Sequence, residues 1–349
     1  MACSFAWAWR DLSQAELFAM PSWYGGYAST PNLSATGIFA GPLSISYTRY
    51  CLRTYSWYAI QKTLPATQDK GWFVFRWRHG SATTTGYYLG ALTDGPLATV
   101  RIGVRASTSN LANSTLNLYV NGTLVGTSTT AVGSSESLIA VKYDLSIATA
   151  AAGLWINGVQ EVGVGGALVA GSGGTQTIDG LYFAGGYSYP YYNYVGDIIM
   201  YDSLADAGER TGVHLVPLDP TDDVLTTGWT STGANFFGEM DDYAATTYAQ
   251  SVVDPTGPLE LGHQERADVD ALWTGGTFDA IVTYHHAVGD GALTSATIGV
   301  NAGATNPTEV VVLTIVSEAH AHVMAVDPVT GVAWTGAGVD ALVTTIEVT

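Results

Sequence analysis

The sequence predicts an all-β protein with two domains, a jelly-roll sandwich followed by a second, acidic β-sandwich. Three observations support this prediction. The 349-residue chain contains 41 glycines, and only 12% of its residues are charged. Strand-like alternating segments recur about every ten residues with turn signals between them, which is typical of sandwiches and barrels. The charge composition changes near residue 213, which indicates a boundary between residues 1–212 and residues 213–349.

Two Asn-Gly pairs organise the first domain. Residues 116–127 alternate up to Asn121-Gly122, and residues 153–162 repeat the pattern around Asn157-Gly158. A two-residue type I′ turn requires positive φ at both central positions, which Asn and Gly tolerate best. The sequence therefore predicts two hairpins in an antiparallel meander. Backbone geometry alone explains the turns, so they carry no functional signal.

The other elements follow in chain order. An irregular aromatic lead-in with a short helix at 13–18 is expected first. Residues 71–78 place aromatic residues on both faces of a strand, and 163–175 are a Gly- and Ala-rich loop. Strands are predicted at 36–46, 55–62, 71–78, 87–92, 99–105, 138–144, 178–183 and 196–202, then at 279–285, 295–301, 309–316, 320–326 and 342–348.

A family resemblance rests on three motifs in residues 38–202. They are Leu118-Tyr119-Val120-Asn121-Gly122, Leu154-Trp155-Ile156-Asn157-Gly158, and residues 178–183 followed by 194–202. These motifs and their order resemble a laminin-G-like, or concanavalin-A-like, domain. The resemblance implies a laminin-G-like jelly-roll sandwich at 1–212.

A second resemblance covers most of residues 214–349. Its most specific parts are Trp229-Thr230-Ser231-Thr232-Gly233 and Asp327-Pro328-Val329-Thr330-Gly331, which continues to Trp334-Thr335. They resemble the C-terminal half of tailed-bacteriophage virion structural proteins that carry a laminin-G-like first half. Residues 260–303 depart from that pattern.

This second resemblance implies a structural protein of a phage virion, in the tail tip, a fibre or the head surface as a capsid decoration. It would be located in the virion, act in assembly and have other virion proteins as partners. The alternative is a virion-borne adhesin that binds a host-surface glycan or receptor. A bacterial carbohydrate-binding module is a less favoured reading.

The charge is unevenly distributed. Residues 1–212 hold 11 of the 12 Lys and Arg residues, whereas residues 213–349 hold Arg266 and 18 of the 30 Asp and Glu residues. Such an acidic domain repels nucleic acid. We expect residues 1–212 to provide the self-association surface of a homo-oligomer. The apolar run at 310–316 is too short to cross a membrane, so no membrane partner is expected. Residues 1–10 lack the pattern of a secretory signal, so no export signal is expected.

The sequence does not predict an enzyme. Glycosidases of the concanavalin-A-like class need an acid and a nucleophile close together. The nearest match, Glu239-Met240-Asp241, has Tyr243 and Ala244 where the second Glu is required. A Gly-x-Ser-x-Gly elbow and a phosphate-binding glycine loop are also absent from the sequence.

Metal sites are weak candidates, and no cofactor is favoured. Glu318, His320 and His322 share one face of a strand, and His285-His286 could approach from a neighbouring strand. The alternative is a polar, exposed sheet face. Ca²⁺ could bind the acidic residues Asp219, Asp222, Asp223, Asp241 and Asp242, whose alternative role is solvated surface charge.

The strongest binding candidate is the tyrosine-rich segment 187–194, predicted as a loop. Tyrosine offers a flat apolar face and a hydroxyl, which suit a glycan or a protein partner. The alternative is an aromatic cluster that covers one end of the sandwich. The candidate residues are Tyr187, Tyr189, Tyr191, Tyr192 and Tyr194.

Overall fold

The computed structural model of the 349-residue chain divides into two compact units. Unit 1 comprises Met1–Arg10 and Pro21–Leu215, and unit 2 comprises Asp11–Met20 and Val216–Thr349. None of the described helical segments is long and apolar enough to cross a membrane. The residues that the structure describes are 3–7, 23–26, 32–34, 51–55, 59–79, 88–95, 99–108, 114–132, 136–184, 192–205, 222–226, 229–231, 249–251, 259–262, 280–287, 295–301, 308–312, 318–335, 338–339 and 342–348.

The first sheet of unit 1 has nine strands in the order β13-β12-β11-β6-β16-β4-β3, with β1 paired to β16 and β14 paired to β12. All its described ladders are antiparallel. The strands are β1 (Cys3–Trp7), β3 (Asn32–Ser34), β4 (Cys51–Tyr55), β6 (Lys70–His79), β11 (Ser137–Asp144), β12 (Ala151–Ile156), β13 (Val159–Val162), β14 (Val169–Ala170) and β16 (Tyr192–Tyr201).

The second sheet of unit 1 has seven strands in the order β10-β9-β8-β7-β15-β5-β2. Its ladders are also antiparallel. The strands are β2 (Trp23–Gly26), β5 (Ala59–Gln68), β7 (Tyr88–Asp94), β8 (Thr99–Ala106), β9 (Leu116–Val120), β10 (Thr123–Thr127) and β15 (Ile178–Ala184).

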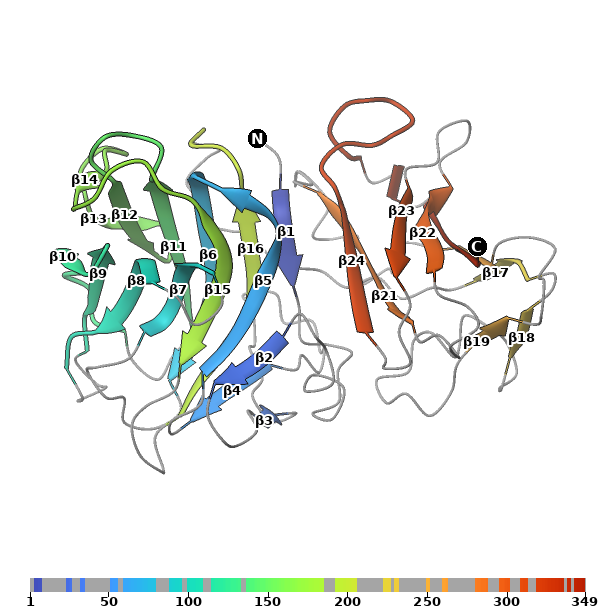
Figure 1. Ribbon diagram of the computed structural model, residues 1–349, viewed down its shortest axis with the longest axis horizontal. Helices are drawn as coiled ribbons and strands as arrows, with labels where there is room; N and C mark the ends of the chain where they lie inside the picture. Colours follow the sequence, from blue (N-terminus) through green and yellow to red (C-terminus); the bar gives the residue numbers. More distant parts are fainter. Residues whose placement is uncertain are drawn as a thin grey trace. The chain divides into compact units, whose positions relative to one another are not determined.

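The two sheets of unit 1 pack face to face around aromatic side chains. Phe73 and Phe75 from β6 meet Phe183 from β15, with ring centroids 5.9 Å and 5.7 Å from the Phe183 ring. In Figure 1, β15 and β5 of the seven-stranded sheet are drawn in front of β6 and β16 of the nine-stranded sheet. This arrangement confirms the predicted antiparallel sandwich.

The opposite face of the nine-stranded sheet is also buried. Trp72 on β6 and Trp155 on β12 are 1% and 3% exposed, and their ring centroids lie 4.8 Å apart. The Nζ atom of Lys142 lies 5.3 Å from the centroid of the Trp72 ring. The aromatic residues that the sequence places on both faces of β6 are therefore buried on both sides of the sheet.

Both predicted Asn-Gly turns are confirmed. Asn121 and Gly122 have φ values of 48° and 78°, and Asn157 and Gly158 have φ values of 49° and 83°. The Asn157 side chain also accepts a hydrogen bond from the backbone N–H of Leu138 at 2.8 Å. The second turn therefore joins β12 to β13 and also fixes the start of β11.

Three local predictions differ from the structure. β16 begins at Tyr192 and not at Gly196, because residues 192–195 pair with β4 and residues 193–196 pair with β6. The predicted strand 55–62 divides into β4, which ends at Tyr55, and β5, which begins at Ala59. The predicted loop 163–175 contains β14, which pairs with β12. The helix at 13–18 and the strand at 36–46 lie outside the described residues.

Unit 2 is also antiparallel β structure. Its sheets are a five-stranded sheet with the order β17-β20-β25-β22-β23 and the two-stranded ribbons β18-β19 and β21-β24. The strands are β17 (Asp222–Leu225), β18 (Trp229–Ser231), β19 (Ala249–Ser251), β20 (Leu259–Gly262), β21 (Ile281–Ala287), β22 (Ser295–Asn301), β23 (Thr308–Val312), β24 (Glu318–Met324) and β25 (Val343–Val348).

An apolar cluster connects the five-stranded sheet of unit 2 to the β21–β24 ribbon. Val300 of β22 and Met324 of β24 belong to this cluster together with Trp334, and Ile281 of β21 packs against it. The indole N–H of Trp334 donates a hydrogen bond to the backbone carbonyl of Met324 at 2.9 Å. These contacts confirm the predicted second β-sandwich.

The Asp-Pro-x-Thr-Gly motif of unit 2 forms a turn before Trp334. The Asp327 carboxylate accepts hydrogen bonds from Val329 N–H at 2.8 Å and from the Thr330 hydroxyl at 2.9 Å. Gly331 has a φ of 70° and donates its N–H to the Asp327 carbonyl.

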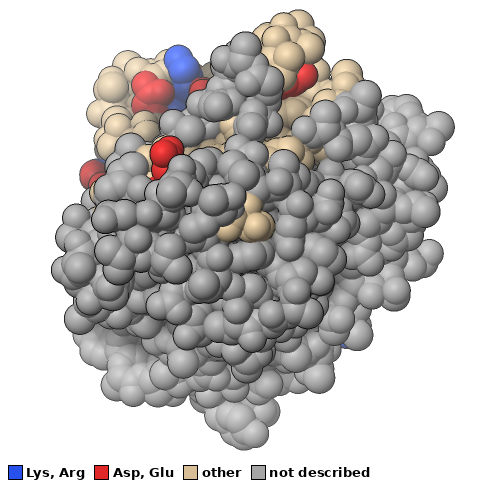
Figure 2. Space-filling view, turned by 90° about the vertical axis from the view of Figure 1, so that its right-hand side faces the viewer, with Lys and Arg blue, Asp and Glu red and all other residues tan. Residues whose placement is uncertain are grey.

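On the face drawn in Figure 2, the described residues include Asp and Glu side chains in red.

Candidate functional site

The structure describes little of the predicted tyrosine site. Tyr187, Tyr189 and Tyr191 lie outside the described residues. Tyr192 and Tyr194 belong to β16, opposite Tyr55 and Arg53 of β4, and their side chains are not described. The glycan or partner site at these tyrosines stays a prediction.

The other predicted chemical groups fall in different places. Glu239, Asp241 and Asp242 lie outside the described residues. Asp222 and Asp223 are adjacent in β17, opposite Gly262 and Leu261. Asp219 lies outside the described residues, and the side chains of Asp222 and Asp223 are not described, so the calcium site stays a prediction. Among the described side chains, three or more His, Cys, Asp or Glu residues do not come together as a metal-binding group.

The outer face of the seven-stranded sheet carries a polar aromatic surface that we call the Tyr-Arg face. The core side of β8 and β9 holds the buried residues Ile102, Val104, Ala106, Leu116, Leu118 and Val120. The alternate positions lie on the other side of the sheet. They are Gly103 and Arg105 on β8 and Asn117 and Tyr119 on β9, with Tyr88 of β7 opposite Arg105.

Gly103 allows the Tyr88 ring to lie against the sheet. A Cβ atom at position 103 would lie 2.2 Å from Cε1 of Tyr88, far inside normal contact distance. The ring therefore occupies the space that any larger residue at position 103 would need. Tyr88 and Tyr119 meet edge to face, with ring centroids 6.2 Å apart and an interplanar angle of 87°.

Arg105 lies over both tyrosine rings. Its guanidinium carbon is 3.9 Å from the Tyr88 centroid and 4.7 Å from the Tyr119 centroid. These distances are within the range of cation–π attraction. Within the part of the chain that the structure describes, Arg105 makes no ion pair, and its Nε atom is buried without a hydrogen-bond partner.

Arg101 lies on the same strand and face but, unlike Arg105, has polar partners among the described residues. Its guanidinium pairs with the Asp94 carboxylate and donates to the Asn121 side-chain oxygen at 3.5 Å. Leu124 of β10 is opposite Tyr119 and is 50% exposed. The Tyr-Arg face thus combines two tyrosine rings, an arginine without a carboxylate among the described residues, and an exposed apolar side chain at its β10 end.

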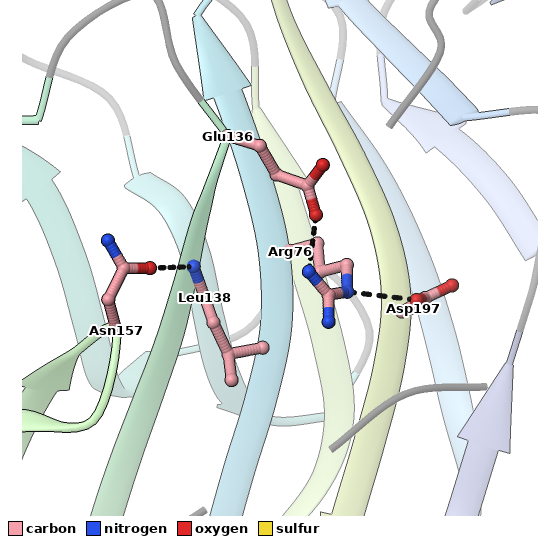
Figure 3. A network of polar contacts seen from close by, with 5 residues as sticks. All are labelled: Arg76, Glu136, Leu138, Asn157 and Asp197. Atoms are coloured by element: carbon pink, nitrogen blue, oxygen red, sulfur yellow. Dashed lines mark hydrogen bonds and ion pairs between the residues drawn. The ribbon is translucent and has the colours of Figure 1, made fainter. Parts of the chain in front are cut away.

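A second polar group lies in the nine-stranded sheet. Figure 3 shows the Arg76 guanidinium between the carboxylates of Glu136 and Asp197. The Nε atom of Arg76 donates to Asp197 at 3.0 Å, and Asp197 has a φ of 44° at an irregular point of the β6–β16 ladder. Arg76 and Asp197 are 4% and 7% exposed. These ion pairs connect β6 with β16 and with the residue before β11 inside the fold, so we assign them a structural role.

Glu161 connects β13 to the chain after β10. Its carboxylate accepts hydrogen bonds from the backbone N–H of Thr129 at 2.7 Å and of Thr130 at 3.0 Å, and from both threonine hydroxyls. Burial raises the pKa of the Glu161 carboxyl, but the hydrogen bonds from Thr130 and Thr129 outweigh this effect and hold the pKa below its ordinary value.

Sequence reasoning missed the Tyr-Arg face. The alternation of Arg101, Gly103 and Arg105 within a predicted strand was the available signal, since it places two arginines on one face. The contribution of Tyr88 depends on the β7–β8 register, which includes irregularities after Tyr88 and after Leu92. A sequence pattern does not specify such shifts.

Comparisons with known proteins give structural similarities only. No protein-family model matches the sequence, and no curated protein matches it. One similar structure is domain 4 of AbnA, a GH43 extracellular arabinanase from Geobacillus stearothermophilus, in complex with arabinotriose. The two are 10% identical, the match covers 60% of this chain and 97% of that one, and the TM-score is 0.39.

Two further structures are similar at the same level. The carbohydrate-binding module CBM66 from Bacillus subtilis is 10% identical, with coverage of 51% of this chain and 94% of that one and a TM-score of 0.31. The Bacillus licheniformis β-glucanase is 13% identical, with coverage of 57% and 98% and a TM-score of 0.35. Such low values do not establish a substrate or an activity for this chain.

Proposed function

We propose that unit 1 is a non-catalytic glycan-binding domain whose contact surface is the Tyr-Arg face. The observation that supports this proposal most is the position of Arg105, 3.9 Å and 4.7 Å from the centroids of two tyrosine rings and without a carboxylate partner among the described residues. Tyrosine rings pack against the apolar face of a sugar ring, and their hydroxyls form hydrogen bonds at its edge.

The arginine indicates the class of glycan. A guanidinium presents a planar set of donors that matches a carboxylate, and its position on two rings lowers the entropy lost on binding. We therefore propose oligosaccharides with a carboxylate as the preferred ligands. Arg101 is less available to bind a ligand carboxylate, because the Arg101 guanidinium already pairs with Asp94.

The same face does not resemble a glycosidase site. Two carboxylates must flank the scissile bond in most glycosidases. The central described positions of the Tyr-Arg face are Tyr88, Gly103, Arg105, Asn117 and Tyr119, none of which is Asp or Glu. We propose that the chain binds glycans without hydrolysing them. In a tailed-phage virion, the setting expected from the sequence, such a domain would act as an adhesin; this setting stays a prediction.

A glycan array tests the proposed function. The full-length chain is compared with Arg105→Ala and with Arg101→Ala, a matched arginine on the same strand and face. We expect wild-type protein to bind carboxylated oligosaccharides, with binding lost in Arg105→Ala and largely kept in Arg101→Ala. Absence of binding to every glycan by folded wild-type protein, or equal losses in both variants, would contradict the proposal.

A further inference from the structure

We propose a zinc site on the β21–β24 ribbon of unit 2, formed by His285, His320 and His322 with a water molecule as the fourth ligand. The ladder register supports this proposal, since it places His285 directly opposite His320. His286, the next residue, is opposite Ala319 on the other face of the ribbon. The sequence alone did not distinguish these two histidines.

The geometry of an antiparallel ribbon suits a shared metal ion. Directly opposite residues have Cβ atoms about 4.5–5.5 Å apart, and diagonal neighbours about 7–8 Å apart are still within reach of long side chains. His320 is opposite His285, His322 is two residues further along β24, and Glu318 is two residues before His320. The three histidine positions therefore form one compact group on one face. Glu318 is four residues from His322 on the same strand, a distance of about 13 Å, so these two residues do not bind the same ion.

The chemistry of the three histidines matches zinc. Imidazole nitrogen is a common zinc ligand, and three protein ligands with a water molecule in the fourth position complete a tetrahedral site. Ca²⁺ and Mg²⁺ prefer sets of oxygen ligands and suit this group poorly. Residues 213–349 hold one basic and 18 acidic residues, a net charge of 1 − 18 = −17, and this negative field attracts cations to the unit.

A second observation lies beside the histidines. Thr283 is opposite His322 and is only 5% exposed, and its hydroxyl has no hydrogen-bond partner in the described part of the chain. A buried hydroxyl without a partner is costly. Histidines that bind a metal usually donate their second ring N–H to a nearby acceptor, which orients the ring. A metal-bound His322 would provide the donor that the Thr283 hydroxyl lacks.

The same face continues into the core of unit 2. Met324 is opposite Ile281 at the end of the ribbon and is 6% exposed. It belongs to the apolar cluster that includes Trp334, and Ile281 packs against this cluster. Zinc bound to residues of both strands would cross-link β21 to β24 and so stabilise this packing. The proposed effect of the metal is therefore to stabilise the β21–β24 ribbon.

Zinc binding to the full-length chain tests the proposal. After chelation, the protein is titrated at pH 7.5 with Zn²⁺ alone by calorimetry, and with Co²⁺ while its visible absorption is recorded. We expect one equivalent of Zn²⁺ to bind, Co²⁺ to give the spectrum of a tetrahedral site, and the melting temperature to rise with Zn²⁺. Binding weakens below about pH 6, because protonated imidazole is not a ligand.

Variants locate the site. His320→Ala weakens zinc binding by more than about 100-fold, and Thr283→Val weakens it by about 10-fold, as expected for a ligand and for its orienting neighbour. His286→Ala is the matched control and binds like wild type. If His320→Ala does not fold, His285→Gln provides the same comparison. Failure of wild-type protein to bind Zn²⁺, or equal losses in His286→Ala and in the ligand variant, would overturn the proposal.

Discussion

The contact between Gly103 and Tyr88 gives a prediction that links the fold to the proposed site. In Gly103→Ala, the new Cβ would lie 2.2 Å from Cε1 of Tyr88. Carbon atoms in contact are about 3.5–4.0 Å apart, so the ring has to move by more than about 1 Å. This movement takes the Tyr88 ring out of its contacts with Arg105 and Tyr119.

The expected magnitude follows from those contacts. Loss of the cation–π contact costs about 0.5–1 kcal/mol, and loss of the edge-to-face ring pair costs about 0.5–1.5 kcal/mol. Replacement of a strand glycine by alanine by itself stabilises the folded state by about 0.5–1 kcal/mol, which partly offsets these losses. The net destabilisation is about 0.5–1.5 kcal/mol, which lowers the melting temperature of unit 1 by roughly 1–6 °C for a domain of this size.

A double-mutant cycle tests this reasoning by thermal unfolding. In the Tyr88→Ala background no ring opposes the new methyl group, so Gly103→Ala is expected to be neutral or stabilising. The coupling between the two positions then falls in the range expected for residues in contact. If Gly103→Ala lowered the melting temperature equally in both backgrounds, the clash with Tyr88 would not be the cause.

Three further substitutions test the fold. Gly158→Val destabilises unit 1 by about 1 kcal/mol or more, because φ of 83° at that turn is unfavourable for a β-branched residue; an unchanged melting temperature would contradict this. Gly71→Ala costs more, about 3 kcal/mol, because its Cβ would lie 1.8 Å from the backbone oxygen of Tyr201; normal soluble expression and stability would contradict this. Glu161→Gln lowers the melting temperature at pH 7. The carboxyl pKa is depressed in the folded state, so its stabilisation is present above the unfolded pKa of about 4.3 and is lost as the pH falls through the folded pKa. The difference between wild type and Glu161→Gln should therefore shrink below about pH 4, and a difference independent of pH would refute this.

Local features of the fold were predictable from the sequence. Asn157-Gly158 encodes its own turn, since both residues tolerate positive φ and the flanking residues alternate. The alternation of residues 71–78 likewise predicts a strand, and β6 spans Lys70–His79. These features depend on residues within one or two neighbouring strands.

Features that depend on pairing between distant segments were not predictable. Tyr192 was assigned to a loop, but its segment forms a strand because β4 and β6 supply partners. Arg105 and Tyr88 are separated by 17 residues in the sequence and meet only through the β7–β8 register. The distinction between His285 and His286 depends on the alignment of β21 with β24. A shift of one residue in that alignment would exchange the two faces.

The most direct test of the proposed function compares a carboxylated oligosaccharide with its neutral, carboxyl-reduced counterpart. Calorimetry with full-length wild type and Arg105→Lys measures both affinities at low and at high salt. If Arg105 on its two tyrosine rings recognises a carboxylate, wild type binds the acidic glycan at least about tenfold more tightly, which corresponds to about 1.4 kcal/mol. This preference should fall with salt and be lost in Arg105→Lys, which keeps the charge but not the planar set of donors. Equal affinity of wild type for the two glycans, or an unchanged preference in Arg105→Lys, would contradict the proposal.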